Sequence, residues 1–335
     1  MSKRISICIS TWCRKDYLRE IIHLLQDQTI PQSDYEIIVC DSYSPDGTKE
    51  VMEELCKRYS NIRYLNTKKN VLAVKRNMGI RASESPIVVF MDDDVFPTNH
   101  FVEAHLSAHE DTDGVVFCGQ IRFQQEWVKR SNYYRYRDDC HLGEKDRPIW
   151  DDLPFNKIVV MNLSFKKDEL LNKVGFVDER FIGYGGEDTE FGYRITKSGL
   201  KLVYLEKALA YHYEKSPSIV AFGEKIFRSG RDGARTLNDI DPNIVGATQL
   251  GLLDSSTEFG ENCRNIFKKK VFNLLVNKPM ANLIAWVLVN TDNLRFCYNH
   301  QLYRYYLAYR FKEGVLAQRE LKLTLDDVKT GWYDK

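Results

Sequence analysis

The stretch Ile87-Val88-Val89-Phe90-Met91-Asp92-Asp93-Asp94 decides the fold, because an unbroken apolar run stops abruptly at three carboxylates. A short apolar run of this kind is typical of a strand buried on both faces of a sheet. Ile37–Cys40 has the same form and ends at Asp41, and alternating apolar residues precede Thr11. Helical periodicity separates these runs at about residues 16–28, 48–59 and 74–82. The alternation predicts an α/β fold with a mostly parallel central sheet flanked by helices.

The acidic triplet is a candidate metal site. Ligands of open α/β sheets bind beyond the carboxyl ends of the strands, where Asp41 and Asp92 both fall. Asp92 and Asp94 can share one face of an extended segment, and paired carboxylates suit a hard divalent cation. The plain alternative is a solvated acidic turn, which the preceding buried strand makes less favourable.

A second candidate lies in Gly185-Gly186-Glu187-Asp188-Thr189-Glu190. Adjacent glycines permit close backbone approach to a ligand, and Glu187 and Asp188 fall in the first turn of a predicted helix. Acids favour helix N-termini for dipole reasons alone, so this segment by itself does not establish a site. His212 follows an apolar strand between two tyrosines, whereas His105 and His109 are expected at the surface.

Composition excludes several classes of protein. The 335 residues carry 48 basic and 47 acidic side chains, which argues against a general nucleic-acid binder. The charge is unevenly divided: residues 215–335 hold 18 basic and 13 acidic side chains. The scattered cysteines and the N-terminus, which lacks a signal-peptide pattern, predict a reduced, cytoplasmic setting. No apolar stretch approaches the roughly 20 residues that cross a bilayer.

Five segments, in order, resemble family 2 glycosyltransferases of the GT-A (Rossmann-like) fold. They are Ile5–Thr11 with Asp41, Val71–Gly79, Phe90–Asp94, Met161–Phe165, and Gly175–Asp178 continued by Gly183–Arg194. The last two are similar to the galactosyltransferase-type C-terminal motif of bacterial capsule and surface polysaccharide enzymes, and to animal β-1,4-galactosyltransferases. The resemblance covers residues 3–215. It predicts a catalytic domain at 1–216, followed by an α-helical region at 217–335.

The resemblance also implies residue roles. Thr11, Asp41, Arg76, Asp92 and Asp93 would bind a nucleotide-sugar donor, a UDP-sugar by family. Asp94, with His212 and Asp92, would hold Mn²⁺ or Mg²⁺. Asp188 would be the catalytic base and Glu187 would position hydroxyl groups. The segment Asp41-Ser42-Tyr43-Ser44 departs from the family's acidic-Gly-Ser pattern. Tyr43 would therefore affect which nucleotide base the donor site accepts.

These roles predict a metal-dependent inverting enzyme. It would move a hexose or N-acetylhexosamine to a hydroxyl of a glycan or lipid-linked acceptor in surface polysaccharide synthesis. A sugar-phosphate nucleotidyltransferase is an alternative, although Thr11–Lys15 lacks that class's glycine-rich loop. A non-catalytic nucleotide-sugar or glycan-binding module is another, although binding alone requires no base.

The C-terminal region combines basic and aromatic residues, with nine basic side chains and one acid, Asp292, within 264–312. One interpretation is peripheral attachment to an anionic membrane surface, on the inner face of the plasma membrane. The other is a helical subdomain packed on the catalytic domain or on a second copy in a homo-oligomer. The sequence leaves both open.

Overall fold

The computed structural model describes residues 3–140, 153–215, 217–246 and 263–317. Their main feature is a sheet with the strand order β3-β2-β1-β4-β7-β6-β8-β5. β1 is parallel to β2 and β4, β2 is parallel to β3, and β6 is parallel to β8. β7 is antiparallel to both β4 and β6, and β5 is antiparallel to β8. The strands are β1 (Ile5–Ser10), β2 (Tyr35–Asp41), β3 (Ile62–Asn66), β4 (Ile87–Asp92), β5 (Val95–Pro97), β6 (Val115–Arg122), β7 (Asn162–Lys166) and β8 (Lys201–His212). The prediction of a mostly parallel sheet is confirmed.

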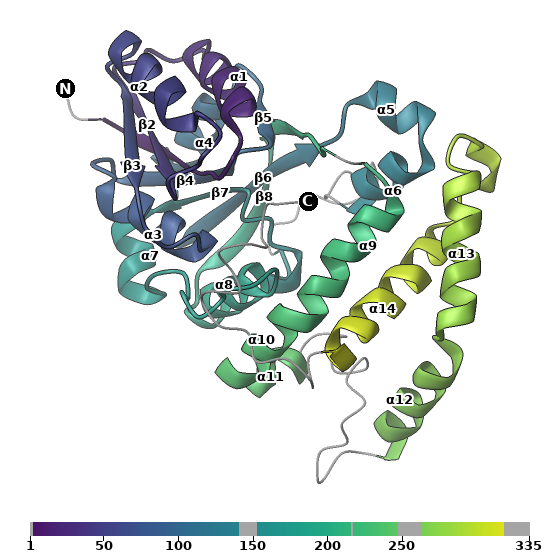
Figure 1. Ribbon diagram of the computed structural model, residues 1–335. Coiled ribbons are helices and arrows are strands. Elements are labelled where there is room, and N and C mark those ends of the chain that lie inside the picture. The colour runs from purple at the N-terminus through teal and green to yellow at the C-terminus, as the bar shows by residue number, and fades with distance from the viewer. Residues whose placement is uncertain (1–2, 141–152, 216, 247–262, 318–335) are drawn as a thin grey trace.

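Helices cover both faces of this sheet (Figure 1). One face packs against α1 (Lys15–Gln26), α2 (Thr48–Arg58) and α4 (Phe101–Glu110). The other packs against α3 (Leu72–Ala82), α7 (Lys167–Lys173) and α8 (Glu187–Lys197). Successive residues of β1, β2 and β4 therefore go to opposite cores, which explains why β2 and β4 contain continuous apolar runs.

The register brings the carboxyl ends of three strands together. Ser10 at the end of β1 pairs with Cys40 of β2 on one side and with Asp92 of β4 on the other. The loops that follow these strands consequently share one edge of the sheet. This is the edge at which the sequence predicted the chemistry.

Within 217–246 and 263–317, the described residues are mainly helical, as predicted, and pack on the sheet domain (Figure 1). Their core includes Tyr133 and Tyr136 of α6 (Asn132–Cys140). The helical elements are α9 (Ile219–Arg228), η2 (Ser229–Gly233), α10 (Ala234–Ile240), α11 (Pro242–Gly246), α12 (Cys263–Leu275), α13 (Lys278–Asn290), η4 (Arg295–Cys297) and α14 (His300–Ala317). Asp292 accepts a hydrogen bond from the Tyr133 backbone N–H through its side chain, at 2.7 Å.

None of the helices that the structure describes is long and apolar enough to cross a membrane by itself. Ile266–Leu275 and Lys278–Asn290 meet the length and hydropathy criteria only as a pair, and the pair is bent by 58°.

Between β6 and β7 the described residues form α5 (Gln125–Arg130), α6 and the short helix η1 (Phe155–Lys157). The structure corrects one expectation. His105 and His109 are buried rather than at the surface, because both hydrogen-bond to Ser164 on β7 at 2.9 Å. Burial lowers the pKa of His105 to about 3 and of His109 to about 4, so both stay neutral.

Candidate active site

Each of the three carboxylates in the acidic triplet has its own set of partners. Asp92 ends β4 and receives a hydrogen bond from Arg76 Nη2 at 3.2 Å. Asp93 accepts hydrogen bonds from Thr11 Oγ1 at 2.8 Å and from the Trp12 backbone at 3.2 Å. Asp94 lies between His212 and Arg14, with carboxylate-to-nitrogen distances of 3.6 and 3.9 Å. The turn thus joins the loop after β1, helix α3 and the end of β8.

Asp93 and Thr11 form a buried contact beneath this edge of the sheet. Thr11 is wholly buried and Asp93 nearly so. Burial, together with the nearby Asp94, raises the pKa of Asp93 to about 7. Donor binding by this pair stays a prediction, because neither side chain reaches the surface in this conformation.

His212 is brought to Asp94 by strand pairing. β5 follows the acidic turn directly and pairs with β8 so that Val95 lies opposite His212. The Tyr213 backbone N–H donates to the Asp94 carbonyl at 2.9 Å and extends this ladder. Burial alone would raise the pKa of Asp94, but His212, Arg14 and Lys225 lower it to about 2. Asp94 is therefore an anion at neutral pH.

Within the residues that the structure describes, no three His, Cys, Asp or Glu side chains converge as a complete metal site. Asp94 and His212 supply one carboxylate and one imidazole close together. This donor set fits a divalent ion whose remaining positions are filled by a phosphorylated ligand and water.

Arg76 is the centre of a second charge cluster. Its Nη1 lies 3.3 Å from Asp188 and 4.0 Å from Glu187, while its Nη2 contacts Asp92. Burial would lower the pKa of this guanidinium, but Asp92, Asp188 and Glu187 raise it above the ordinary value. One fixed cation therefore connects the acidic turn to the helix that carries Asp188.

Glu187 and Asp188 begin α8 directly after Gly186, whose φ of 94° favours glycine. The Glu187 side chain is 11% exposed and that of Asp188 36%. Burial and the neighbouring Asp188 raise the pKa of Glu187 to about 7, and burial also raises the pKa of Asp188. The Glu187 Oε2 atom is buried and accepts no hydrogen bond from any residue that the structure describes. The pair thus combines a more accessible carboxylate with a carboxyl group that is protonated near neutral pH.

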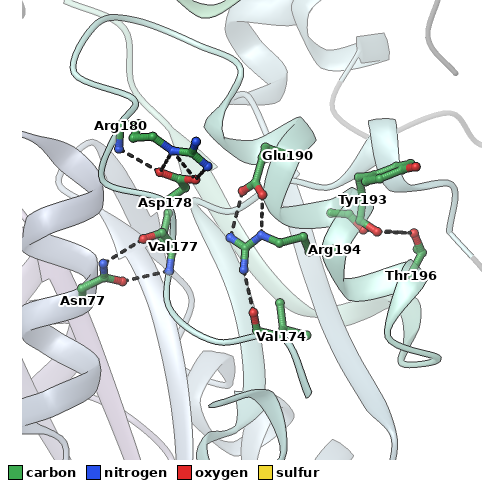
Figure 2. A network of polar contacts seen from close by, with 10 residues as sticks. Asn77, Val174, Val177, Asp178, Arg180, Glu190, Tyr193, Arg194 and Thr196 are labelled. Atoms are coloured by element: carbon green, nitrogen blue, oxygen red, sulfur yellow. Dashed lines mark hydrogen bonds and ion pairs between the residues drawn. The ribbon is translucent and has the colours of Figure 1, made fainter. Parts of the chain in front are cut away.

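Asn77, next to Arg76 on α3, holds the loop before these acids (Figure 2). Its side chain donates to the Val177 carbonyl at 2.9 Å and accepts from the Val177 N–H at 3.0 Å. Figure 2 also shows Glu190 paired with Arg194, which in turn donates to the Val174 carbonyl at 2.8 Å. Glu190 is therefore structural, in contrast to Glu187 and Asp188 on the same helix.

At the end of β2, the chain forms a compact turn around Asp41. This wholly buried carboxylate accepts hydrogen bonds from the Ser44 hydroxyl at 2.6 Å and the Tyr64 hydroxyl at 2.7 Å. Tyr43 has a positive φ of 58° and is 59% exposed. Strained backbone of this kind clusters at functional sites. Asp41 thus shapes the loop that presents Tyr43.

Sequence reasoning overlooked two cations at this edge. Lys75 is wholly buried and donates to the Thr11 carbonyl at 2.9 Å, and burial lowers its pKa to about 8. Arg14 stacks 5.2 Å from the Tyr17 ring and faces Asp94. Their positions in the sequence could have indicated both residues, because Lys75 precedes Arg76 and Arg14 follows the first strand.

Comparison with known proteins identifies related sequences. Residues 6–167 match the model for glycosyl transferase family 2, and residues 150–216 match the model described as the N-terminal domain of galactosyltransferase. The chain is 28% identical to a chondroitin synthase from Escherichia coli over 63% of this chain and 34% of that one. It is 27% identical to a hyaluronan synthase from Pasteurella multocida over 63% of this chain and 24% of that one. The chain therefore spans about a third of the length of the first synthase and about a quarter of the second.

Two further proteins are matched over most of their length. Glycosyltransferase AglE from Haloferax volcanii is 25% identical over 68% of this chain and 72% of that protein. The solved mannosyltransferase PcManGT from Pyrobaculum calidifontis, in complex with GDP-Man and Mn²⁺, superposes with a TM-score of 0.59 and 14% identity. That alignment covers 96% of this chain and 88% of the other. At this identity the likeness shows the fold, which is GT-A.

Proposed function

Since residues 6–167 match the model for glycosyl transferase family 2 and residues 150–216 match the model described as the N-terminal domain of galactosyltransferase, we propose that the chain is a metal-dependent inverting glycosyltransferase. It transfers a hexosyl or N-acetylhexosaminyl group from a UDP-sugar donor to a hydroxyl of a glycan or lipid-linked acceptor. The reaction belongs to surface polysaccharide synthesis. The observation that carries this proposal is Arg76, which joins Asp92 of the acidic turn to Asp188. Groups suited to the leaving diphosphate and to the attacking hydroxyl therefore lie within one connected cluster.

Asp94 and His212 are the residues that would hold the metal, with Asp92 beside them. A bound divalent ion supplies positive charge for the departing diphosphate. The imidazole favours Mn²⁺ over Mg²⁺, because Mg²⁺ prefers oxygen ligands. The low pKa of Asp94 keeps this ligand charged across the physiological range.

Asp188 is the proposed base. Its carboxylate is more exposed than that of Glu187, and Arg76 fixes its orientation. A base must lie within hydrogen-bond reach of the acceptor hydroxyl, and its pKa should approach the working pH. Burial raises the pKa of Asp188 in that direction. Glu187, protonated up to a pH of about 7, can donate a hydrogen bond to a substrate hydroxyl.

Tyr43 is proposed to contact the nucleotide base, on the loop that Asp41 shapes. An exposed ring held by a strained backbone offers a stacking surface without selecting one base. The chondroitin and hyaluronan synthase relatives favour a donor used in polysaccharide synthesis. The mannosyltransferase neighbour, solved with GDP-Man, makes GDP-sugars the necessary comparison.

A donor panel tests the function. Purified protein with Mn²⁺ is mixed with UDP-, GDP- and TDP-sugars, and both the melting temperature and the release of nucleoside diphosphate are followed. We expect one class of donor to stabilise the protein and to be turned over slowly to the nucleoside diphosphate. If none raises the melting temperature and none is hydrolysed or transferred, the proposal fails. Release of pyrophosphate from a sugar phosphate and a nucleoside triphosphate would instead indicate a nucleotidyltransferase.

A further inference from the structure

Helix α13 is apolar on two opposite faces, of which the protein covers only one. Ala281, Ile284 and Leu288 are buried in the helical core. Met280, Leu283, Trp286 and Val289 recur every third residue on the other side and are exposed, Trp286 at 65%. A helix that is apolar all round is normally buried. The outer face of α13 therefore lacks a covering layer in the part of the chain that the structure describes.

The elements next to α13 along the chain also expose large apolar side chains. On α12, Phe267 is 67% exposed, and Leu274 and Leu275 lie on the same side at a spacing of seven and eight residues. Past the end of α13, Leu294 is exposed and Phe296 on η4 is 87% exposed. We call this set the outer apolar face. The helices α12 and α13, which carry most of it, lie on the side of the molecule away from α2 (Figure 1).

Basic residues border the outer apolar face. On α12, Lys268 and Lys270 are exposed on the two flanks of the stripe made by Phe267 and Leu274. Between Cys263 and Thr291 the sequence contains five basic residues and no acid. An apolar stripe flanked by lysines matches the polarity of a lipid interface, where lysine stems lie along the acyl boundary and ammonium groups reach the headgroups.

The charge also distinguishes between possible occupants. In a twofold dimer the same face meets itself, so two strongly basic segments would be brought together without an acid from either. An anionic bilayer instead supplies the opposite charge, which attracts each basic residue near its surface. Electrostatic complementarity thus favours lipid over a second copy of this chain.

We propose that the outer apolar face, formed by α12, α13 and η4, lies flat on an anionic lipid membrane. The helices rest on the bilayer rather than cross it, because Ala281, Ile284 and Leu288 remain packed in the protein core. Trp286 and Phe296 enter the headgroup and acyl boundary, while Lys268, Lys270 and Lys278 contact anionic headgroups. This role is independent of the sugar donor and of the chemistry at Asp188.

Vesicle flotation tests the proposal with the full-length protein. The lipids are phosphatidylcholine alone and phosphatidylcholine with phosphatidylglycerol, each at low and high salt. One variant combines Trp286→Gln with Phe296→Gln, and its control combines Val220→Gln with Phe176→Gln, which are exposed apolar residues elsewhere. A second variant reverses Lys268, Lys270 and Lys278 to Glu. Its control reverses the exposed Lys49, Lys57 and Lys201 to Glu.

The native chain should float with anionic vesicles and lose most of this binding at high salt. The aromatic variant should bind at least about tenfold more weakly and the lysine variant about a hundredfold, with unchanged melting temperatures. Both controls should bind like the native chain. Absence of flotation with either lipid overturns the proposal. Equal loss in variants and controls also overturns it, as does self-association in light scattering that Trp286→Gln abolishes without lipid.

Discussion

At the scale of single residues, Arg76 organises the site. It is buried, and its two terminal nitrogens face Asp92 on one side and Asp188 on the other. An unpaired buried guanidinium would be costly, so the position of this side chain depends on the acids and theirs depends on it. The sequence predicted that Arg76 belongs to the site. Its connection between β4 and α8 required the three-dimensional arrangement, because 112 residues separate Arg76 from Asp188.

Replacement of Asp188 by Asn is expected to abolish transfer while donor binding persists. The amide retains the shape of the side chain but cannot accept the acceptor's proton, and loss of a general base costs roughly 10²–10⁴-fold in rate. The measurement is the transfer rate beside calorimetric donor affinity. In the native protein the rate should rise with pH through a value above the ordinary Asp pKa of 3.8, because burial raises the pKa of Asp188. An active variant would exclude Asp188 as the base.

Replacement of Asp94 by Ala should remove the metal dependence of donor binding. Asp94 is the charged member of the Asp94–His212 pair, and no third described residue completes a metal site there. Calorimetric titration of donor with and without Mn²⁺ measures the effect. Asp113→Ala is a suitable control, because that aspartate is exposed and pairs with Lys166. An unchanged response to Mn²⁺ in the Asp94 variant would reject it as a ligand.

At the scale of elements, η2 supports the loop that carries the acids. A Cβ at Gly233 would collide with the Gly185 carbonyl, and a Cβ at Gly186 would lie 3.1 Å from the Gly233 carbonyl. A Cβ at Gly230 would collide with the Phe311 carbonyl of α14. The helical region thus fits closely against the Gly185–Gly186 loop. Because glycine lacks a side chain, the backbones can approach each other at these points.

Gly233→Ala should slow transfer more than it destabilises the fold. The added methyl group displaces the Gly185–Gly186 backbone and, with it, the start of α8 that carries Glu187 and Asp188. Misplacement by about 1 Å can cost a hundredfold in rate, so a fall of ten- to a hundredfold in kcat is expected. The control is Arg235→Ala, an exposed position on α10. Native kcat in the Gly233 variant would show that η2 does not position the acids.

At the scale of the whole molecule, the near-neutral charge separates into an acidic site and a basic helical surface. The sequence predicted the sheet, the helices on its two faces and the clustering at the strand ends, because these follow from local periodicity. It did not reveal that Lys75 is buried, that His105 is internal or that Glu190 is structural. Lys75 and His105 depend on partners distant in sequence, Thr11 and Asn162 respectively. Glu190 depends on Arg194, whose other hydrogen bond goes to the Val174 carbonyl.

Cutting the chain after residue 216 should leave an unstable catalytic half. The helical region buries Tyr133 and Tyr136 of α6, and Asn132 donates hydrogen bonds to the Thr291 and Leu294 carbonyls. Removing these partners exposes apolar rings and leaves buried polar groups unsatisfied. Thermal unfolding and size-exclusion chromatography would compare the two chains. A truncated protein that is monomeric and melts at the native temperature would establish 1–216 as an independent domain.

In the proposed mechanism, Asp188 deprotonates the acceptor hydroxyl that attacks the sugar. The residues proposed to bind the metal hold the leaving diphosphate. Once the donor panel identifies a substrate, nuclear magnetic resonance of the purified product determines the anomeric configuration of the new linkage. Single displacement predicts inversion, giving a β linkage from an α-linked nucleotide-sugar, with no product from Asp188→Asn. Retention of the α configuration, or the same product from Asp188→Asn, would contradict the account.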